Sequence, residues 1–263
     1  MPPAAIDVRS VIDFFAKGLA AFKASSSGFR VLRSLPHGGV TSSAPRQLIV
    51  LDSSFNPPTV AHAEMIHTAV RSSSVATPRV LLLLAVQNAD KAPAPASFPA
   101  RLAMMESFGH GILDKADVDG VDIGVTTEPY FPDKASAIEE TYAGMKQVFL
   151  VGYDTLIRVF DAKYYPEGSM DSVIKPFLAK ASLRVTLRTD GKWGGKEEQQ
   201  AFWKGLEAWQ RKEVELVEGI GGAVSSSRVR EKVRLGEDVG ELVGAGVQWW
   251  IKEANLYVEG DSR

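Results

Sequence analysis

The side chains best suited to chemistry in this sequence are phosphate ligands, and the most informative group of them is residues 53–62. Ser53 and Ser54 directly follow an apolar run, and two prolines then stiffen a short turn. Thr59 is a favourable N-cap for a helix that would follow. The free amide groups of a helix start attract anions, so His62 in the first turn could donate to a phosphate oxygen. The segment predicts a phosphate site between a strand and a helix.

A second candidate phosphate site lies near the C-terminus, in residues 221–230. A glycine-containing loop leads there into three consecutive serines and a predicted helix start. The hydroxyl and amide groups of Ser226 and Ser227 would donate to polyphosphate oxygens, and Arg230 would place a fixed positive charge beside them. By itself this pattern also suits a plain N-cap or a phosphorylation site, so its assignment depends on what accompanies it.

Together the two segments resemble the motifs of the nicotinamide mononucleotide adenylyltransferases, a nucleotidyltransferase family marked by an H/T-x-x-H pattern. Residues 53–62 are similar to (G)SFNPxTxxH, and residues 224–230 are similar to ISSTxxR, in the same order along the chain. The resemblance is to a divergent eukaryotic member of fungal type, in which Thr59 stands where the wider superfamily has its first histidine. It implies that His62 contacts the ATP phosphates. One departure is Ser53, which replaces the usual glycine and restricts how closely substrate and backbone approach.

Three further segments extend the resemblance over residues 47–257. Residues 86–91 resemble a segment that carries a substrate-contacting lysine, and Gly152-Tyr-Asp-Thr-Leu156 resembles G-x-D-x-L, whose glycine and aspartate meet the adenylate ribose. Residues 249–257 resemble the closing helix of the family. The predicted ATP-binding residues are Ser53, Ser54, Phe55, Thr59, His62, Gly152, Asp154, Ser226, Ser227 and Arg230. The predicted acceptor-binding residues are Asn56 and Lys91, and no residue is predicted to bind a metal directly.

The acceptor is less well defined by the resemblance than the donor. Family members often hold the nicotinamide ring between aromatic side chains. The candidates in the central region are Tyr130, Phe131, Tyr164 and Tyr165. All five tryptophans lie at residue 193 or later, and the helical spacing of Trp209 with Phe202 and Leu206 predicts a core residue.

The implied reaction is attack by a phosphate oxygen of the acceptor on the α-phosphorus of ATP, with release of pyrophosphate. The second pKa of a phosphate monoester is about 6, so the nucleophile is ionised near neutral pH and needs no general base. Catalysis would consist of positioning two polyanions and neutralising their charge, with His62 and Arg230 as the catalytic residues. Mg²⁺ would be carried on the ATP phosphates, because the sequence shows no dedicated cage of carboxylates.

The elements that must position these side chains alternate between strands and helices. Apolar runs typical of buried parallel strands occur at 47–51, 80–86, 121–125, 147–151, 183–187 and 214–217. Helices are expected at 60–71, from Pro99 to Phe108, and at 134–145, 196–211, 226–235 and 239–254. Four aspartates between residues 114 and 122 lack the spacing of an EF-hand and predict a polar loop before a strand. The alternation predicts an α/β, Rossmann-like nucleotidyltransferase fold, a mostly parallel sheet with helices on both faces and ligands at the carboxyl ends of the strands.

Residues 1–46 differ from the rest and are predicted to form an N-terminal helical extension. Apolar residues recur at helical spacing over 7–23, and a loop rich in Ser, Gly and Pro follows. The excess of basic residues and serines allows a transit peptide, but Asp7 and Asp13 interrupt the basic face and favour a helix packed on the main domain. The predicted division is residues 1–46 as helix and linker, 47–257 as the nucleotidyltransferase domain, and 258–263 as a tail.

Composition excludes several classes of function. The formal net charge of −2 disfavours extensive contact with nucleic acid, and no apolar run approaches the roughly 20 residues needed to cross a membrane. Cysteine is absent, which excludes disulfides and thiolate chemistry. The partners that the resemblance implies are ATP and nicotinamide mononucleotide. The sequence leaves open whether the protein forms a homo-oligomer, and it favours a cytoplasmic or nuclear location without excluding mitochondrial import.

Two alternative functions remain at the level of sequence. The first is nucleotidyl transfer to another phosphorylated acceptor, such as phosphopantetheine or a lipid head-group phosphate. The second is a nucleotide-binding regulator or weak ATPase that has lost transferase activity, an interpretation supported by Ser53 and by the lack of a central tryptophan. The sequence does not decide between the amide and the acid form of the pyridine nucleotide.

Overall fold

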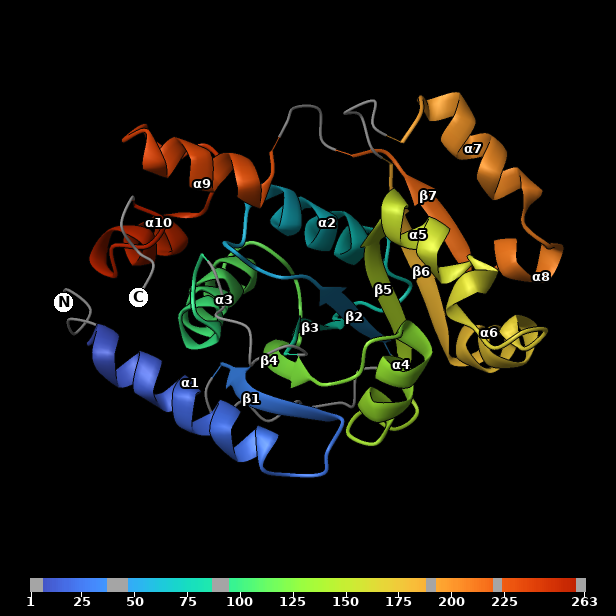
Figure 1. Cartoon of the computed structure of the whole chain (residues 1–263), viewed down its shortest axis with the longest axis horizontal. Coiled ribbons are helices and arrows are strands. Elements are labelled where there is room, and N and C mark those ends of the chain that lie inside the picture. The colour runs from blue at the N-terminus through green and yellow to red at the C-terminus, as the bar shows by residue number, and fades with distance from the viewer. Residues whose placement is uncertain (1–6, 37–46, 87–94, 188–192, 220–223, 259–263) are drawn as a thin grey trace.

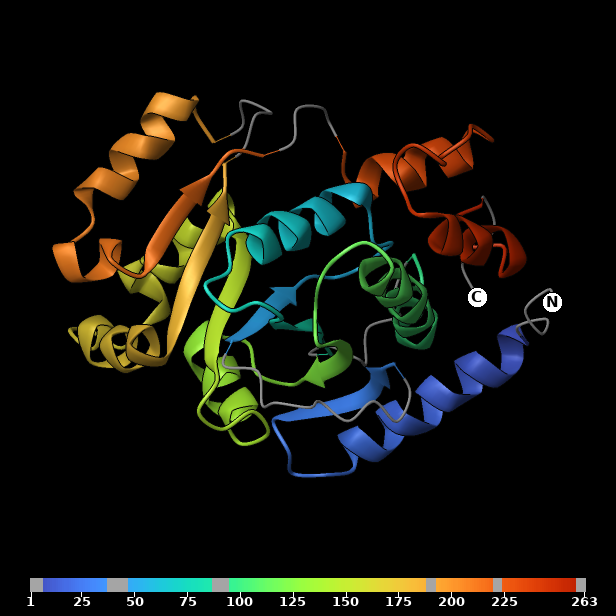
Figure 2. The same ribbon diagram turned by 180° about the vertical axis from the view of Figure 1, so that it is seen from behind.

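The computed structural model describes residues 7–36, 47–86, 95–187, 193–219 and 224–258, and these residues build one sheet with helices on both faces (Figures 1 and 2). Its seven strands lie in the order β1-β4-β3-β2-β5-β6-β7. Every neighbouring pair is parallel except β1 and β4. The strands are β1 (Phe29–Leu35), β2 (Gln47–Asp52), β3 (Arg79–Ala85), β4 (Gly120–Thr126), β5 (Lys146–Gly152), β6 (Ala181–Thr186) and β7 (Val214–Val217). The strand order reverses at β2, and in such sheets ligands bind beyond the carboxyl ends at this switch point.

Two hydrophobic cores form because successive side chains of a strand point to opposite faces of the sheet. In β2, Ile49 and Leu51 pack with α1, α2, α3, α9 and α10, whereas Leu48 and Val50 pack with α4 to α8. The helices of the described residues are α1 (Val8–Lys23), α2 (Val60–Arg71), α3 (Phe98–Leu113), α4 (Phe131–Glu139), α5 (Tyr153–Val159), the 3₁₀ turn η1 (Ala162–Tyr164), α6 (Met170–Lys180), α7 (Lys196–Gly205), α8 (Ala208–Arg211), α9 (Ser226–Arg234) and α10 (Ala245–Glu253). The predicted α/β fold is confirmed. None of these helices is long and apolar enough to span a bilayer.

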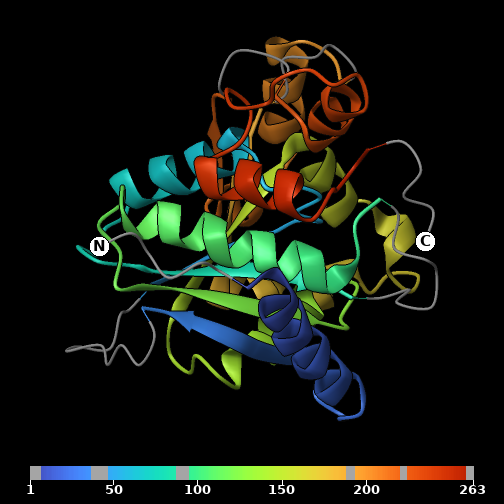
Figure 3. The same cartoon turned by 90° about the vertical axis from the view of Figure 1, so that its left-hand side faces the viewer.

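The N-terminal segment contributes a strand to the sheet, which differs from the predicted helix and linker. Helix α1 packs on α3 through buried Phe15, Leu19 and Phe22, as the packed-helix interpretation expected (Figure 3). The predicted linker, however, contains β1, which pairs antiparallel with β4. Only the first and last residues of β1 are buried, so its sequence shows little hydrophobic alternation. Residues 29–35 are thus joined to the sheet through β4, and the predicted division at residue 46 stays a prediction.

Other element bounds also differ from the predictions. Helix α4 starts and ends earlier than 134–145, and the predicted helix 196–211 is interrupted because Leu206 has extended backbone between α7 and α8. The last helix begins at Ala245 rather than residue 239, with Gly244 as its N-cap. Helices α5 and α6 were missed, and α6 contains Pro176, a residue that weakens the helix signal in a sequence.

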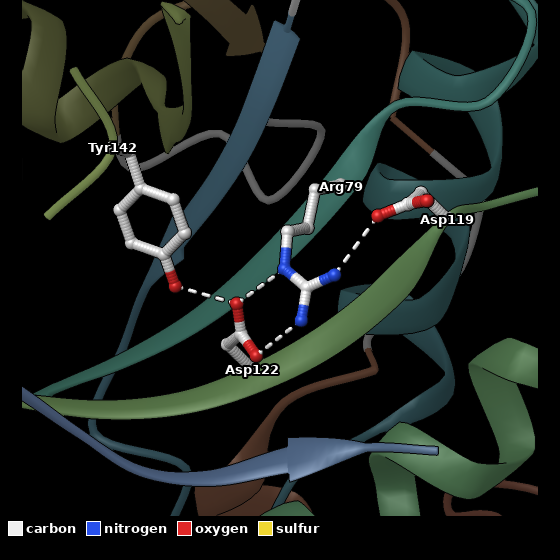
Figure 4. Close-up of polar contacts among 4 residues, drawn as sticks. All are labelled: Arg79, Asp119, Asp122 and Tyr142. Atoms are coloured by element: carbon white, nitrogen blue, oxygen red, sulfur yellow. Dashed lines mark hydrogen bonds and ion pairs between the residues drawn. The ribbon is translucent and has the colours of Figure 1, made fainter. Parts of the chain in front are cut away.

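A buried polar network joins β3 to β4 at their amino ends, far from the carboxyl edge of the sheet (Figure 4). Arg79 donates through Nε and Nη2 to the two carboxylate oxygens of Asp122, at 2.6 and 2.8 Å, and through Nη1 to Asp119 at 2.9 Å. The Tyr142 hydroxyl donates to Asp122 Oδ2 at 2.5 Å. The bonds from Asp122 raise the pKa of Arg79, and burial raises the pKa of Tyr142. Asp119, in the predicted polar loop, and Asp122, in the strand that follows it, thus share one arginine.

Candidate active site

The first predicted phosphate segment forms a tight turn between β2 and α2. The Ser53 amide donates to the Leu83 carbonyl of β3 at 3.2 Å, which extends the sheet by one residue. Phe55 then adopts a left-handed backbone, with φ of 45°. A bulky residue rarely takes this conformation, and its cost is offset by the complete burial of the ring beside His62 and Phe108, with centroid distances of 5.5 and 6.4 Å. The turn therefore has one defined shape.

The His62 ring is oriented by the residue that caps its own helix. The Thr59 amide donates to His62 Nδ1 at 3.0 Å, and Thr59 Oγ1 lies 2.8 Å from the same nitrogen. This is a capping-box contact in which histidine replaces the usual glutamate. Because Nδ1 accepts a hydrogen bond, the proton of the neutral ring is on Nε2. His62 Nε2 lies 3.0 Å from Ser53 Oγ, so this N–H points toward the end of β2.

Burial keeps this imidazole neutral, since it lowers the pKa of His62 to about 4. A neutral ring with Nδ1 engaged is a hydrogen-bond donor through Nε2. The free protein satisfies that donor with the Ser53 hydroxyl. A phosphate oxygen would replace the hydroxyl as acceptor, which is the role predicted for His62.

The depressed pKa predicts that acid weakens the fold through His62. Between pH 6.5 and about 4 the unfolded chain binds a proton at His62 that the native state does not. The free energy of unfolding should therefore be highest above pH 6.5 and fall as the pH is lowered to about 4, by up to about 3 kcal/mol from this residue. Urea unfolding of the wild type and of His62→Asn at pH 7 and pH 4.5 measures the effect. The variant should lose less stability in acid, and an equal loss in both proteins would contradict the prediction.

The second predicted phosphate segment docks directly on the first. Ser225 caps α9 by accepting from the Arg228 amide at 3.2 Å. The Ser226 hydroxyl donates to the Pro57 carbonyl at 2.8 Å, and Arg230 Nη1 donates to the Asn56 carbonyl at 2.8 Å. Arg230 Nη2 also donates to Ser227 Oγ at 3.1 Å. The two motifs therefore form one structure around the same turn.

A second arginine lies within electrostatic range of Arg230. Arg101, at the start of α3, is buried and lies within electrostatic range of Arg230 and Tyr257. Burial and the charge of Arg230 lower the pKa of Arg101. An anion bound near Arg230 would reduce the repulsion between these two cations. Sequence reasoning missed Arg101, since nothing local distinguishes it from other helix residues.

The predicted ribose contacts lie on the strand next to β2. Residues 51 and 150 are register partners, so Gly152 ends β5 at the same edge of the sheet as Ser53. Gly152 caps α5, and a Cβ atom there would lie 2.8 Å from Asp154 Oδ1. Asp154 pairs with Arg158 at 2.8 Å. The location of Gly152 and Asp154 suits the predicted role, which stays a prediction.

The remaining predicted residues include exposed serines and aromatic rings that pack within the fold. Ser54 and Ser227 are exposed, whereas Lys91 lies outside the described residues. Among the aromatic candidates, Phe131 packs edge-on against Phe149 at 5.4 Å, and the Tyr165 hydroxyl donates to the Val159 carbonyl. These two rings serve the fold.

The other two aromatic candidates, Tyr130 and Tyr164, are exposed. Trp209 is partly buried against the core of the α4–α8 face, as predicted.

An ion pair that was not predicted supports the phosphate turn from the other face of the sheet. Asp52, the last residue of β2, pairs with Lys134 of α4, and both side chains are nearly buried. A charge in such an environment requires a partner. The sequence signal for this ion pair was Asp52 itself, a carboxylate that directly follows four apolar strand residues. The pair ties the start of the turn to α4.

Within the described part of the chain, no group of three or more histidine, aspartate or glutamate side chains is arranged to hold a metal ion. The side chains around the turn are instead a hydrogen-bond donor, His62, and a cation, Arg230, at the switch point of the sheet. Such a site can bind a polyphosphate.

Comparison with known proteins shows which family the chain belongs to. No protein-family model matches the chain. A protein of Schizosaccharomyces pombe named "Putative nicotinamide mononucleotide adenylyltransferase" is 32% identical over 234 residues, which cover 85% of this chain and 88% of the relative.

Two solved structures of Plasmodium falciparum nicotinic acid mononucleotide adenylyltransferase share the fold at 15% identity. They are complexed with APC and with NaAD, and their TM-scores are 0.54 and 0.56. Each comparison covers 81% of this chain and 97% of the other. Together with the two interlocked motifs, the identity to the yeast relative shows that this chain belongs to the nicotinamide mononucleotide adenylyltransferase family.

Proposed function

We propose that this protein transfers the adenylyl group of ATP to nicotinamide mononucleotide, which gives NAD and pyrophosphate. The observation that carries the proposal is the contact between the two motifs. Arg230 and Ser226 hold the carbonyl groups of Asn56 and Pro57, so that a fixed cation and the His62 donor share one turn. Membership of the family supports the same reaction.

In the proposed reaction, a phosphate oxygen of the acceptor attacks the α-phosphorus of ATP. The bond between the α-phosphorus and the bridging oxygen breaks, and pyrophosphate leaves with that electron pair. His62 Nε2–H donates to a phosphate oxygen in place of its contact with Ser53, and Arg230 offsets the negative charge that develops on the leaving group. Mg²⁺ enters as the counter-ion of ATP, since it binds preferentially to substrate phosphates with few protein ligands.

We take the amide nucleotide as the acceptor because the yeast relative is named for it, at 32% identity against 15% for the proteins named for the acid. The acid nucleotide is the comparison substrate in the assay below. A preference for the acid would change the product and leave the chemistry as proposed.

A direct assay with ATP, Mg²⁺ and nicotinamide mononucleotide tests the proposal by measuring NAD and pyrophosphate in equal amounts. His62→Ala should lower kcat/KM at least about 100-fold, because it removes one preorganised donor. The matched control is His67→Ala on the same helix, which should retain most activity because His67 lies farther along α2, where the charges that act on it are those of Glu64, Arg71 and Lys115. ATP binding without formation of a dinucleotide would contradict the proposal and favour a regulator or weak ATPase.

A further inference from the structure

The C-terminal segment reaches back to the phosphate turn and makes a buried hydrogen bond there. After α10, Asn255 and Tyr257 adopt left-handed backbones with φ of 48° and 68°, and these turn the chain toward the site. The Tyr257 hydroxyl donates to Asn56 Oδ1 at 2.8 Å. Both side chains are buried, with exposed fractions of 3% and 5%. Such strained conformations persist where surrounding contacts impose them.

This bond decides which way the Asn56 amide points. Burial raises the pKa of Tyr257, so the phenol keeps its proton and stays a donor. The structure places Oδ1, the only acceptor of the carboxamide, 2.8 Å from this hydroxyl. The amino group Nδ2 therefore points away from Tyr257. Among the residues that the structure describes, none accepts a hydrogen bond from Asn56 Nδ2, while the Asn56 carbonyl is held by Arg230.

We propose that Tyr257 is a positioning residue that orients Asn56, so that Asn56 Nδ2 donates to a phosphate oxygen of the bound nucleotide. The proposal rests on the proposed function for the identity of the substrates. Tyr257 thereby contributes to the reaction although it lies far from the turn in the sequence. Its hydroxyl acts on the substrate only through Asn56.

The variant Tyr257→Phe keeps the ring and removes the hydroxyl. Its kcat/KM for NAD formation should fall about 3- to 10-fold, the size of one neutral hydrogen bond, mainly through a higher KM. In an Asn56→Ala background the same change should cause no further loss, because the oriented donor is already absent. Equal losses in both backgrounds would overturn the proposal.

A second variant, Asn56→Asp, keeps an acceptor for Tyr257 but has no amino group. It should lose at least as much activity as Tyr257→Phe while its Tm stays near that of the wild type. Wild-type activity in Asn56→Asp would overturn the proposal.

The matched control is Ser107→Ala, which removes the 2.8 Å bond from Trp250 Nε1 that ties α10 to α3. It loosens the C-terminal segment as Tyr257→Phe would, but it does not touch Asn56. We expect near wild-type kcat/KM for this control, and a loss equal to that of Tyr257→Phe would show a purely structural role.

Calorimetric titration of each variant with ATP, and separately with nicotinamide mononucleotide, separates this inference from the proposed function. Wild-type protein that binds ATP and forms no NAD would contradict only the function. Weaker binding of either nucleotide by Tyr257→Phe, and unchanged binding by Ser107→Ala, would still support the positioning role. Unchanged binding of both nucleotides by Tyr257→Phe would overturn it.

Discussion

Replacing Arg230 with methionine is expected to lower kcat/KM for NAD formation about 1000-fold, because a fixed cation at a phosphoryl-transfer site contributes on this scale. The side chain has two functions in the structure. Its guanidinium supplies charge at the turn, and its Nη1 holds the Asn56 carbonyl at 2.8 Å. Methionine retains much of the side-chain volume and removes both functions. Steady-state kinetics with ATP and nicotinamide mononucleotide would measure the loss.

Two further variants show which property of Arg230 matters. Arg230→Lys keeps the charge but not the planar fork, so it should recover only part of the lost activity. Arg234→Met removes an exposed cation from the same helix and should stay within about twofold of the wild type. If Arg234→Met were as impaired as Arg230→Met, the effect would reflect the general charge of α9 rather than the contact with the turn.

Removing the carboxylate of Asp122 is expected to lower the free energy of unfolding by about 3–5 kcal/mol, the usual cost of leaving one partner of a buried ion pair alone. Asp122 accepts two bonds from Arg79 and one from Tyr142, and its side chain is 2% exposed (Figure 4). In Asp122→Ala the guanidinium would keep only Asp119 at 2.9 Å. Urea unfolding at pH 7 measures the change.

The same network offers its own controls. Asp119→Ala removes a single contact at the edge of the network and should cost about 1 kcal/mol. The double variant Arg79→Leu/Asp122→Leu removes both charges and should be more stable than Asp122→Ala. Because the network lies at the amino ends of the strands, kcat of the folded variants should not change. A lower kcat in Asp119→Ala would contradict this separation of stability from catalysis.

The parts of the protein that its sequence determines are those encoded in neighbouring residues. The apolar runs identified β2 to β7, and the serines, prolines and cap residues of 53–62 and 224–230 identified both halves of the site. The predicted capping residue, Thr59, also orients His62, which lies only three positions later in the sequence. Local periodicity and turn chemistry are short-range properties, so a sequence displays them directly.

Tertiary structure decided how these pieces meet. Strand β1 is defined by its pairing with β4, and its own residues carry only a weak strand signal. The contacts of Asn56 with Arg230 and Tyr257 join residues 174 and 201 positions apart. The partner of a buried charge or amide depends on strand order and helix packing, which the whole chain settles by burying apolar surface. No local segment of the sequence carries that information.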